Sequence, residues 1–403
     1  MLRYIPAYLS ILTLFVSSVL SGPTPPPYRT QIQAYDGETT GLHIVTLKQG
    51  VSRAEVIRQL ISAAQETVEV VYEYANVFNG FAVDLDDTSL NFLQTLPEVE
   101  TISEDGVMHV TAVVEQTDAP WGLARLSSET QQWSKNQDAS QLSFKYTYDD
   151  SAGAGVDIYV VDTGVRINHT EFGTRARWGK TFGECYSDED DNGHGTHVAG
   201  TAAGAKYGVA KSASIIAVKV LDKDGSGAIS DIIAGLDWVL GQHATTSRPS
   251  IVNMSLGGSS SPSLDDATKR LIEQGIHVVV AAGNSNTDVK DTSPAHVEEV
   301  ITVGASTIND ERAWFSNYGS VVDIFAPGQN ITSAWFRSSD DTLNISGTSM
   351  ASPHVTGLVA YLIALQGNIE PAAMRKKVQE LGTRDVLSDI PSGTINILAH
   401  NNI

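Results

Sequence analysis

The sequence predicts a large parallel α/β domain that follows a small α+β domain. First, 403 residues with 41% hydrophobic side chains support one large core and a second, smaller one. Second, the run 156–161 is short, apolar and rich in β-branched residues, which is typical of a buried strand. Third, residues 40–110 show the order βαββαβ, which suggests a ferredoxin-like fold.

The N-terminus has the features of a secretory signal peptide. Arg3 precedes the apolar stretch 9–20, which is too short to span a bilayer as a helix. The small residues Ser21 and Gly22 follow, so we expect residues 1–21 to be removed and the protein to be secreted to the extracellular space. The alternative is an uncleaved membrane anchor. No later segment is apolar and continuous enough for a transmembrane helix.

The small domain combines short strands with two helices. Ser52 and Glu55 form a capping-box pattern, which predicts a helix that begins there and ends near Glu66. The remaining predicted elements are strands at 43–48, 68–74, 80–85 and 99–104 and a second helix at 88–96.

In the larger domain, two segments place polar side chains at the ends of buried elements. The strand 156–161 delivers Asp162 at its carboxyl end, a usual position for functional groups in a parallel sheet. The segment 191–201 consists mostly of small residues, which indicates a deeply packed helix with His194 at its start.

A third segment supplies a hydroxyl group. Residues 350–365 read as a buried helix with Ser349 in its first turn, beside unpaired backbone N–H groups and the positive end of the helix dipole. Serine is a poor nucleophile until a base takes its proton, which His194 can do, and Asp162 can orient the imidazole. As alternatives, Ser349 and Asp162 are caps, or His194 pairs with His197 on a metal; their spacing and the lack of further ligands make the metal reading weak.

The order Asp162, His194, Ser349 is that of subtilisin-type serine proteases. Further segments are also similar to those of subtilisin-type proteases, at 119–123, 222–236, 253–258, 281–284 and 315–319. Over nearly the whole of residues 116–403 the sequence therefore resembles the subtilase family, and within it the secreted fungal enzymes similar to proteinase K. The resemblance implies a subtilisin-like parallel-sheet catalytic domain with flanking helices and serine endopeptidase activity. A second class of function is a catalytically silent binding protein built on the same fold.

The resemblance also implies how a substrate is held. The Asn284 side chain and the Ser349 N–H would form an oxyanion hole. An extended peptide would lie between two strand edges. The side chain of the residue before the cut would enter a pocket with a wall of small residues. These substrate-binding residues are Gly225, Ser226, Gly227, Ser255, Leu256, Gly257, Ala281, Ala282 and Gly283. The segments contain no acidic residue, so we expect broad specificity with a preference for large apolar or aromatic side chains before the cut.

The position of the small domain resembles that of the subtilase propeptide. We expect residues 22–115, with an inhibitor and chaperone domain at about 40–110, to precede a catalytic domain of residues 116–403. Such a zymogen would cut itself between about Thr111 and Gln116. An accessory domain retained in the mature protein is the alternative.

Composition limits the partners. A net charge of −21 and a pI near 4.7 argue against nucleic acid and anionic membranes. We expect protein and peptide substrates, the propeptide as inhibitor, and a monomer. Cys185 is the only cysteine, so an intramolecular disulfide is impossible.

Calcium and glycosylation are further expectations. The resemblance implies a structural Ca²⁺ held by the main-chain oxygens of Glu298 and Val300 and the carboxylate of Asp323, although Asp323 could instead be a solvated or capping residue. Among four sequons, Asn330 and then Asn168 are the expected acceptors for N-linked glycans.

Overall fold

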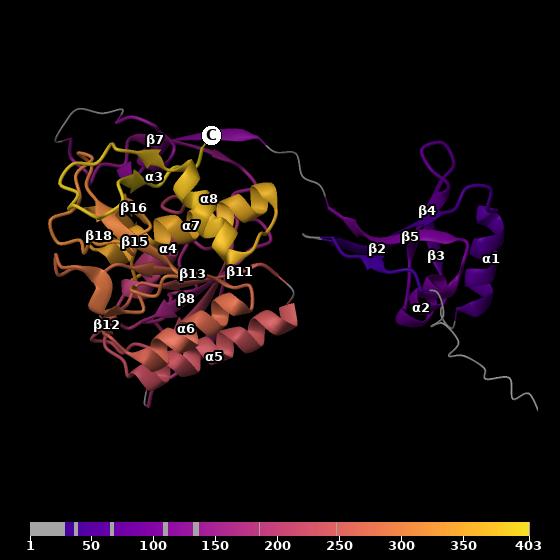
Figure 1. Ribbon diagram of the computed structural model, residues 1–403, viewed down its shortest axis with the longest axis horizontal. Helices are drawn as coiled ribbons and strands as arrows, with labels where there is room; N and C mark the ends of the chain where they lie inside the picture. Colours follow the sequence, from indigo (N-terminus) through magenta and orange to yellow (C-terminus); the bar gives the residue numbers. More distant parts are fainter. Residues whose placement is uncertain are drawn as a thin grey trace, which may run out of the picture. The chain divides into compact units, whose positions relative to one another are not determined.

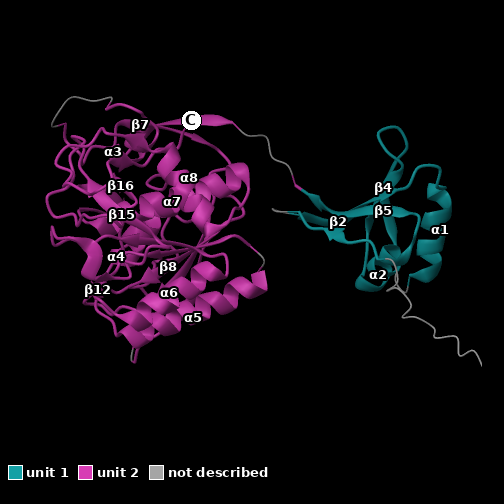
Figure 2. Cartoon of the chain, in the orientation of Figure 1, with its two compact units in different colours: residues 1–35, 39–106 teal, residues 36–38, 107–403 magenta. Residues whose placement is uncertain are grey.

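The computed structural model describes residues 29–35, 39–64, 68–107, 112–131, 137–184, 186–246 and 248–402. The chain divides into two compact units (Figure 2). Unit 1 comprises residues 1–35 and 39–106, and unit 2 comprises residues 36–38 and 107–403. The predicted signal segment 1–21 and Cys185 lie outside the described residues.

Unit 1 is a five-stranded sheet with two helices. Its elements are β1 (Ile32–Gln33), β2 (Thr39–Leu47), α1 (Arg53–Ala63), β3 (Glu69–Tyr74), β4 (Gly80–Asp84), α2 (Asp87–Thr95) and β5 (Val99–Gly106). The sheet order is β1-β5-β2-β4-β3, in which β1 pairs parallel with β5 and the other neighbours are antiparallel. This order confirms the predicted ferredoxin-like βαββαβ arrangement, to which β1 adds an edge strand.

The helices of unit 1 pack on the sheet through one apolar core. Val45, Leu60, Phe81 and Leu93 are all fully buried in it. The predicted capping box of α1 does not form, because the Ser52 side chain makes no capping hydrogen bond. Helix α2 does have a side-chain cap, since Asp86 accepts the backbone N–H of Ser89 at 2.6 Å.

Unit 2 contains a large sheet, its flanking helices and three small two-stranded sheets (Figure 1). Its elements in chain order are β6 (Val113–Ala119), α3 (Trp121–Leu126), β7 (Phe144–Asp149), β8 (Asp157–Asp162), β9 (Ala176–Thr181), α4 (His194–Ala203), β10 (Ser214–Lys219), α5 (Ile229–Thr246), β11 (Ser250–Met254), β12 (Gly258–Ser259), α6 (Pro262–Glu273), β13 (His277–Ala281), the 3₁₀ helix η1 (Val289–Asp291), β14 (Thr292–Ser293), β15 (Ile301–Ser306), β16 (Ile324–Pro327), β17 (Ile331–Ala334), β18 (Thr342–Ile345), α7 (Thr348–Gln366), α8 (Pro371–Leu381), β19 (Thr383–Arg384) and β20 (Ile397–Leu398).

The large sheet has the strand order β19-β20-β16-β15-β13-β11-β8-β10-β9 and is parallel except for the β19–β20 pair. Side chains of β8 alternate between two cores. Ile158 and Val160 belong to the core that also contains α4 and α7, and Tyr159 and Val161 belong to the core that contains α5 and α6. The sheet is thus covered on both faces, which explains why its strands read as continuous apolar runs.

Helix α7 lies in the first of these cores. Among the described residues it is the one helix long and apolar enough by composition to cross a membrane, and 83% of that apolar window is buried inside the structure. Burial against one face of the sheet explains the apolar composition of α7, and it confirms the buried helix predicted for residues 350–365.

The start of unit 2 bears on the predicted processing point. Strand β6 pairs with β7 in antiparallel register, with Val113 opposite Asp149 and Gln116 opposite Tyr146. Residues 113–115, assigned by sequence to the propeptide, therefore pair within unit 2. The boundary between the compact units falls earlier, between residues 106 and 107.

Candidate active site

The carboxyl end of β8 brings an acid and a base together. Asp162, the last residue of β8, is fully buried, and its Oδ1 lies 2.7 Å from Nδ1 of His194, the first residue of α4. Burial alone would lower the pKa of His194, but the charge and hydrogen bond of Asp162 and the charge of Asp190 together raise it. The bond to Nδ1 leaves Nε2 as the ring atom able to accept a proton.

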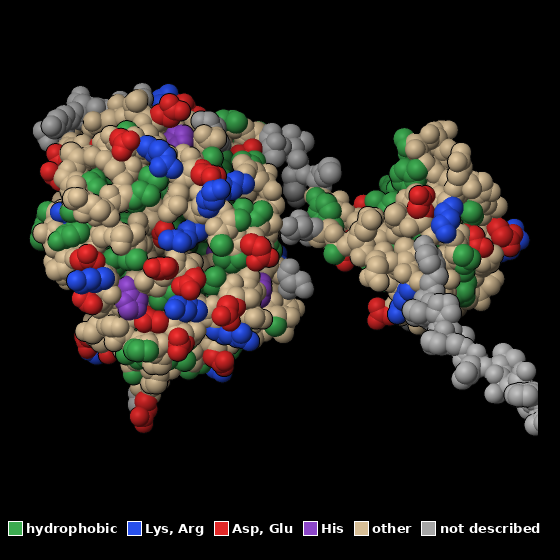
Figure 3. Space-filling view, in the orientation of Figure 1, with side chains coloured by type: hydrophobic (Ala, Val, Ile, Leu, Met, Phe, Trp, Pro, Cys, Tyr) green, Lys and Arg blue, Asp and Glu red, His purple; other side chains and the backbone are tan. Residues whose placement is uncertain are grey.

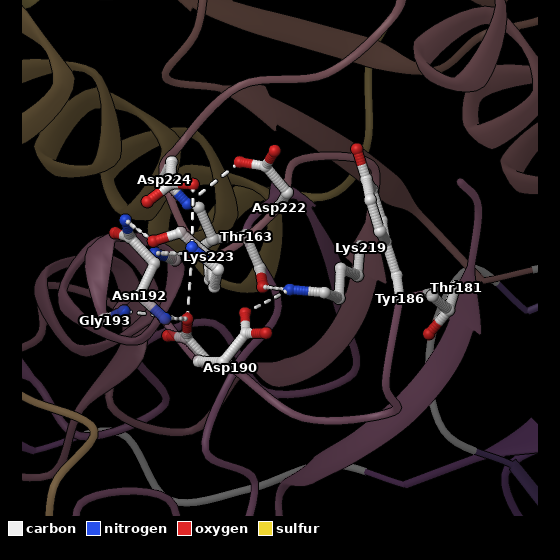
Figure 4. A network of polar contacts seen from close by, with 12 residues as sticks. Thr163, Thr181, Tyr186, Asp190, Asn192, Gly193, Lys219, Asp222, Lys223 and Asp224 are labelled. Carbon is white, nitrogen blue, oxygen red and sulfur yellow. Dashed lines mark hydrogen bonds and ion pairs between the residues drawn. The ribbon is translucent and has the colours of Figure 1, made fainter. Parts of the chain in front are cut away.

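Asp190 and Lys219 hold the segment that leads into His194 (Figure 4). The buried Asp190 carboxylate accepts the Gly193 N–H at 2.8 Å and the Thr163 hydroxyl at 2.9 Å. The fully buried Lys219 ammonium donates to the Thr163 carbonyl and to Asp191, each at 2.7 Å. The strand end that carries Asp162 and the loop that leads into His194 are thereby tied to each other. Neither Asp190 nor Lys219 was predicted from the sequence as part of the site.

Ser349 is the second residue of α7, and a proline farther along the helix affects its contacts. Pro353 has no N–H to bond the carbonyl four residues earlier, which is that of Ser349. That carbonyl instead accepts the Ser255 hydroxyl at 2.9 Å, and the Ser349 hydroxyl donates to the Ser255 carbonyl at 3.1 Å. The first turn of α7 is thus fastened to the segment that follows β11.

His194 and Ser349 line one cleft of about 1180 Å³. Among the residues that the structure describes, the side chains of His194 and Ser349 form no hydrogen bond with each other, because the Ser349 hydroxyl donates to the Ser255 carbonyl. Because the Ser349 hydroxyl donates to the Ser255 carbonyl, that bond must break before the hydroxyl can give its proton to the imidazole.

Asn284 follows β13 and lies beside Ser349 in the cleft. Its Oδ1 accepts both the backbone N–H and the hydroxyl of Thr348 at 2.8 Å. The Thr348 hydroxyl in turn accepts the Gly283 N–H at 3.0 Å. These bonds assign Oδ1 as the acceptor and leave Nδ2 as a donor on the cleft side, the orientation that an oxyanion hole requires. Thr348, next to Ser349 in the chain, is a supporting residue that was not predicted from the sequence.

Most of the predicted substrate-binding residues line the same cleft. These are Gly225, Ser226, Gly227, Ser255, Leu256, Gly257, Ala281 and Gly283. Ala282 does not: it is fully buried in the core on the α5 and α6 side of the sheet. Side chains alternate along an extended chain, so the neighbour of a wall residue points away from the wall. Asp288 and Asp291 also line the cleft. The predicted substrate-binding segments themselves contain no acidic residue.

The alternative metal pair is excluded by the contacts of its two histidines. His194 bonds Asp162, whereas the His197 Nε2 lies 3.0 Å from the Ile331 carbonyl and 3.1 Å from the Leu343 carbonyl. Burial lowers the pKa of His197 to about 3, so this ring is a neutral donor in the core.

The Asp323 side chain, a predicted calcium ligand, is engaged by other side chains. The Asp323 side chain is 2% exposed, and its Oδ1 accepts Nε of Arg375 at 2.7 Å and Nε2 of Gln379 at 2.8 Å. Its Oδ2 accepts the Thr302 N–H at 2.9 Å. The Arg375 guanidinium therefore already supplies a positive charge to this carboxylate. The structure thus places Asp323 in a buried ion pair with Arg375, and the calcium site with Glu298 and Val300 stays a prediction.

Both predicted glycan acceptors are exposed. Asn168 and Asn330 lie on the surface, whereas Asn253 is fully buried. The Asn253 amide accepts the hydroxyls of Ser352 and Thr356 and donates to Ser255, so it braces α7 against β11. Modification of Asn330 and Asn168 remains a prediction.

Comparison with known proteins agrees with this geometry. Residues 153–381 match the Subtilase family, and residues 42–111 match the Peptidase inhibitor I9 family. The chain belongs to the subtilase family. It is a serine endopeptidase preceded by an inhibitor I9 propeptide domain, and the reading as a silent binding protein is not supported.

Several relatives cover most of this subtilase. The cuticle-degrading protease of Metarhizium anisopliae is 46% identical over 361 residues, 89% of each chain. The subtilisin-like serine protease Rho m 2.0101 of Rhodotorula mucilaginosa is 47% identical over 77% of this chain and 93% of its own. A solved structure of a cold adapted subtilisin-like serine proteinase has a TM-score of 0.63 and 42% identity, covering 70% of this chain and 98% of its own. These comparisons confirm the fold class predicted for both domains.

Proposed function

We propose that Asp162, His194 and Ser349 form the catalytic triad of a secreted, self-processing endopeptidase. The observation that carries this proposal is the 2.7 Å bond between the buried Asp162 and His194, which lines the same cleft as Ser349. The Ser349 hydroxyl gives its proton to His194 and attacks the scissile carbonyl carbon; His194 then protonates the leaving amine. Asp162 stabilises the imidazolium formed in between.

The Asn284 Nδ2 and the Ser349 N–H receive the negative charge that develops on the carbonyl oxygen. The bonds from Thr348 to Asn284 Oδ1 support this role, because they hold the amide in place before the charge appears. An extended peptide lies between residues 225–227 and 255–257, and its backbone supplies most of the contacts.

The side chain before the cut enters the part of the cleft walled by Ala281 and Gly283. The small wall supports a preference for large apolar or aromatic residues there, and Asp288 and Asp291 add charge along the cleft. Peptides that differ only in Phe, Leu, Lys or Glu before the cut would test it. A kcat/KM higher for Lys than for Phe would contradict the apolar preference.

The enzyme acts outside the cell on protein substrates after removal of its propeptide. The acidic composition and a visible face on which carboxylates and basic side chains alternate (Figure 3) support protein substrates over nucleic acid.

The test is Ser349→Ala. We expect the variant to hydrolyse no peptide and to remain as the uncut precursor, since Ser349 is the attacking group for both reactions. Phenylmethylsulfonyl fluoride should modify the wild type at Ser349, and peptide mapping by mass spectrometry would locate the adduct. An adduct at the nearby buried Ser352, or no adduct at all, would refute the assignment.

A further inference from the structure

Unit 2 carries a second hollow beside the cleft, with an exposed tryptophan on its rim. The Trp314 side chain is 74% exposed, and its ring lies edge-on against Phe315 with centroids 5.6 Å apart. The hollow measures about 590 Å³, and its lining includes Asn286, Glu311, Trp314, Gln329, Asp389 and Ile390. The ring is held on one side by Phe315, and its remaining surface is open to contact with a ligand.

The hollow adjoins the groups proposed for catalysis. The segment that carries Trp314 runs along the segment that carries Asn284: the Asn317 N–H donates to the Gly283 carbonyl at 2.9 Å, and the Asn286 N–H donates to the Phe315 carbonyl at 2.8 Å. Residues 284, 285 and 287 line the main cleft, whereas Asn286 lines the hollow. One stretch of chain therefore forms a wall of both.

The segment before Ser349 provides the second connection. The Gly347 N–H donates to the Gly328 carbonyl at 2.8 Å, and the next residue, Gln329, lines the hollow. The edges proposed to bind residues before the cut, 225–227 and 255–257, all lie in the main cleft and not in the hollow. A peptide bound along those edges with its scissile carbonyl at Ser349 and Asn284 has the hollow open to the part that follows the cut.

Among the described residues, the hollow contains one basic side chain that is bonded to the protein and two acidic side chains that are not ion-paired. The Arg312 guanidinium is occupied by protein acceptors, with Nε 3.0 Å from the Asp389 carbonyl and Nη1 2.9 Å from Asn286 Oδ1, and it stacks on Tyr318. The carboxylates of Glu311 and Asp389 form no ion pair with any of the residues that the structure describes. An aromatic face beside two free carboxylates suits a cationic side chain.

We propose that this hollow binds the peptide substrate on the leaving-group side, and that Trp314, Glu311 and Asp389 favour Arg or Lys two to four residues after the cut. The proposal rests on the proposed catalytic function and adds a specificity determinant to it. The ring accepts the cation on its face, and the two carboxylates complement its charge.

The experiment compares substrates with and without residues after the cut. Internally quenched peptides share Phe before the cut and carry Arg, Ala or Glu at the second to fourth positions after it. A 4-nitroanilide with the same residues before the cut has no such positions. We expect Trp314→Ala to lower kcat/KM for the Arg peptide by roughly 3- to 30-fold, the range of one cation–π contact, and to change the nitroanilide by less than about twofold.

Two further variants separate the ring from the charges. Trp314→Phe keeps an aromatic face and should retain most of the Arg preference. Glu311→Gln combined with Asp389→Asn should reduce the Arg preference while leaving the Ala peptide unchanged. Equal losses on all substrates, nitroanilide included, or no change on the Arg peptide would overturn the proposal. A wild type inactive on every substrate would instead count against the proposed function.

Discussion

Replacing Arg375 should show that a guanidinium, and not calcium, neutralises Asp323. Burial raises the pKa of Asp323 from 3.8 to about 6, even though Arg375, Thr302 and Gln379 act in the opposite direction. That difference corresponds to about 3 kcal/mol by which the ionised, folded carboxylate opposes folding. The carboxylate is thus only partly compensated with Arg375 present, and less so without it.

Arg375→Met keeps most of the side-chain stem and removes the charge. Loss of one partner of a buried ion pair costs about 3–5 kcal/mol, and we expect the lower end because Gln379 and Thr302 remain as donors and Arg375 is 32% exposed. For a domain of this size that is a fall in Tm of roughly 5–10 °C. Differential scanning calorimetry would measure it on enzyme inactivated with phenylmethylsulfonyl fluoride, so that self-digestion does not contribute.

The pH dependence has a definite sign. Since the folded pKa of Asp323 lies above its unfolded value, protonation favours the folded state, and this stabilisation is complete below about 3.8 and lost as the pH rises through about 6. Arg375→Met raises that pKa further, so its deficit against the wild type should be largest at pH 7–8 and shrink toward pH 5. The exposed pair Arg270–Glu273 offers a matched control, and Arg270→Met should cost no more than about 1 kcal/mol.

Adding a chelator to the wild type distinguishes a guanidinium from a calcium ion as the partner of Asp323. If the guanidinium takes the place of a metal, a strong chelator leaves the Tm of the wild type unchanged. The reasoning is refuted if the chelator lowers that Tm and calcium restores it, or if the deficit of Arg375→Met is the same at pH 5 and pH 8.

Three other predictions concern activity. Asn284→Ala should lower kcat by roughly 10²–10³ with KM nearly unchanged, a magnitude known from the corresponding asparagine of the related enzyme subtilisin, because Nδ2 acts only on the charged carbonyl oxygen; steady-state kinetics that raised KM alone would contradict it. Because Asp162 and Asp190 together raise the pKa of His194 against its burial, kcat/KM should fall with decreasing pH along a limb centred above 6.5, and a limb centred lower would contradict the site. Residues 22–113, produced separately, should inhibit the mature enzyme at micromolar concentrations, and a dose–response assay without inhibition would exclude that role.

The element types and the reactive side chains could be predicted from the amino-acid sequence. Apolar runs at 156–161 and 350–365 indicated a strand and a helix, because burial on both faces demands such composition, and β8 and α7 lie there. Asp162 directly follows the apolar run 156–161, and His194 and Ser349 each stand at the start of a predicted helix. All three could therefore be predicted as candidate reactive residues. The βαββαβ order of unit 1 likewise followed from local alternation and turn residues.

The partner of each polar group depends on the three-dimensional packing. Asp323 meets Arg375, which lies on a helix 52 residues later, so no local pattern could distinguish a calcium ligand from a buried ion pair. Lys219 and Asp191 meet across 28 residues, and Thr348 meets Asn284 across 64. The pairing of β6 with β7 similarly placed residues 113–119 within unit 2. Contacts between residues far apart in the chain depend on how whole elements pack, and the pattern along the chain records only which face of an element is apolar.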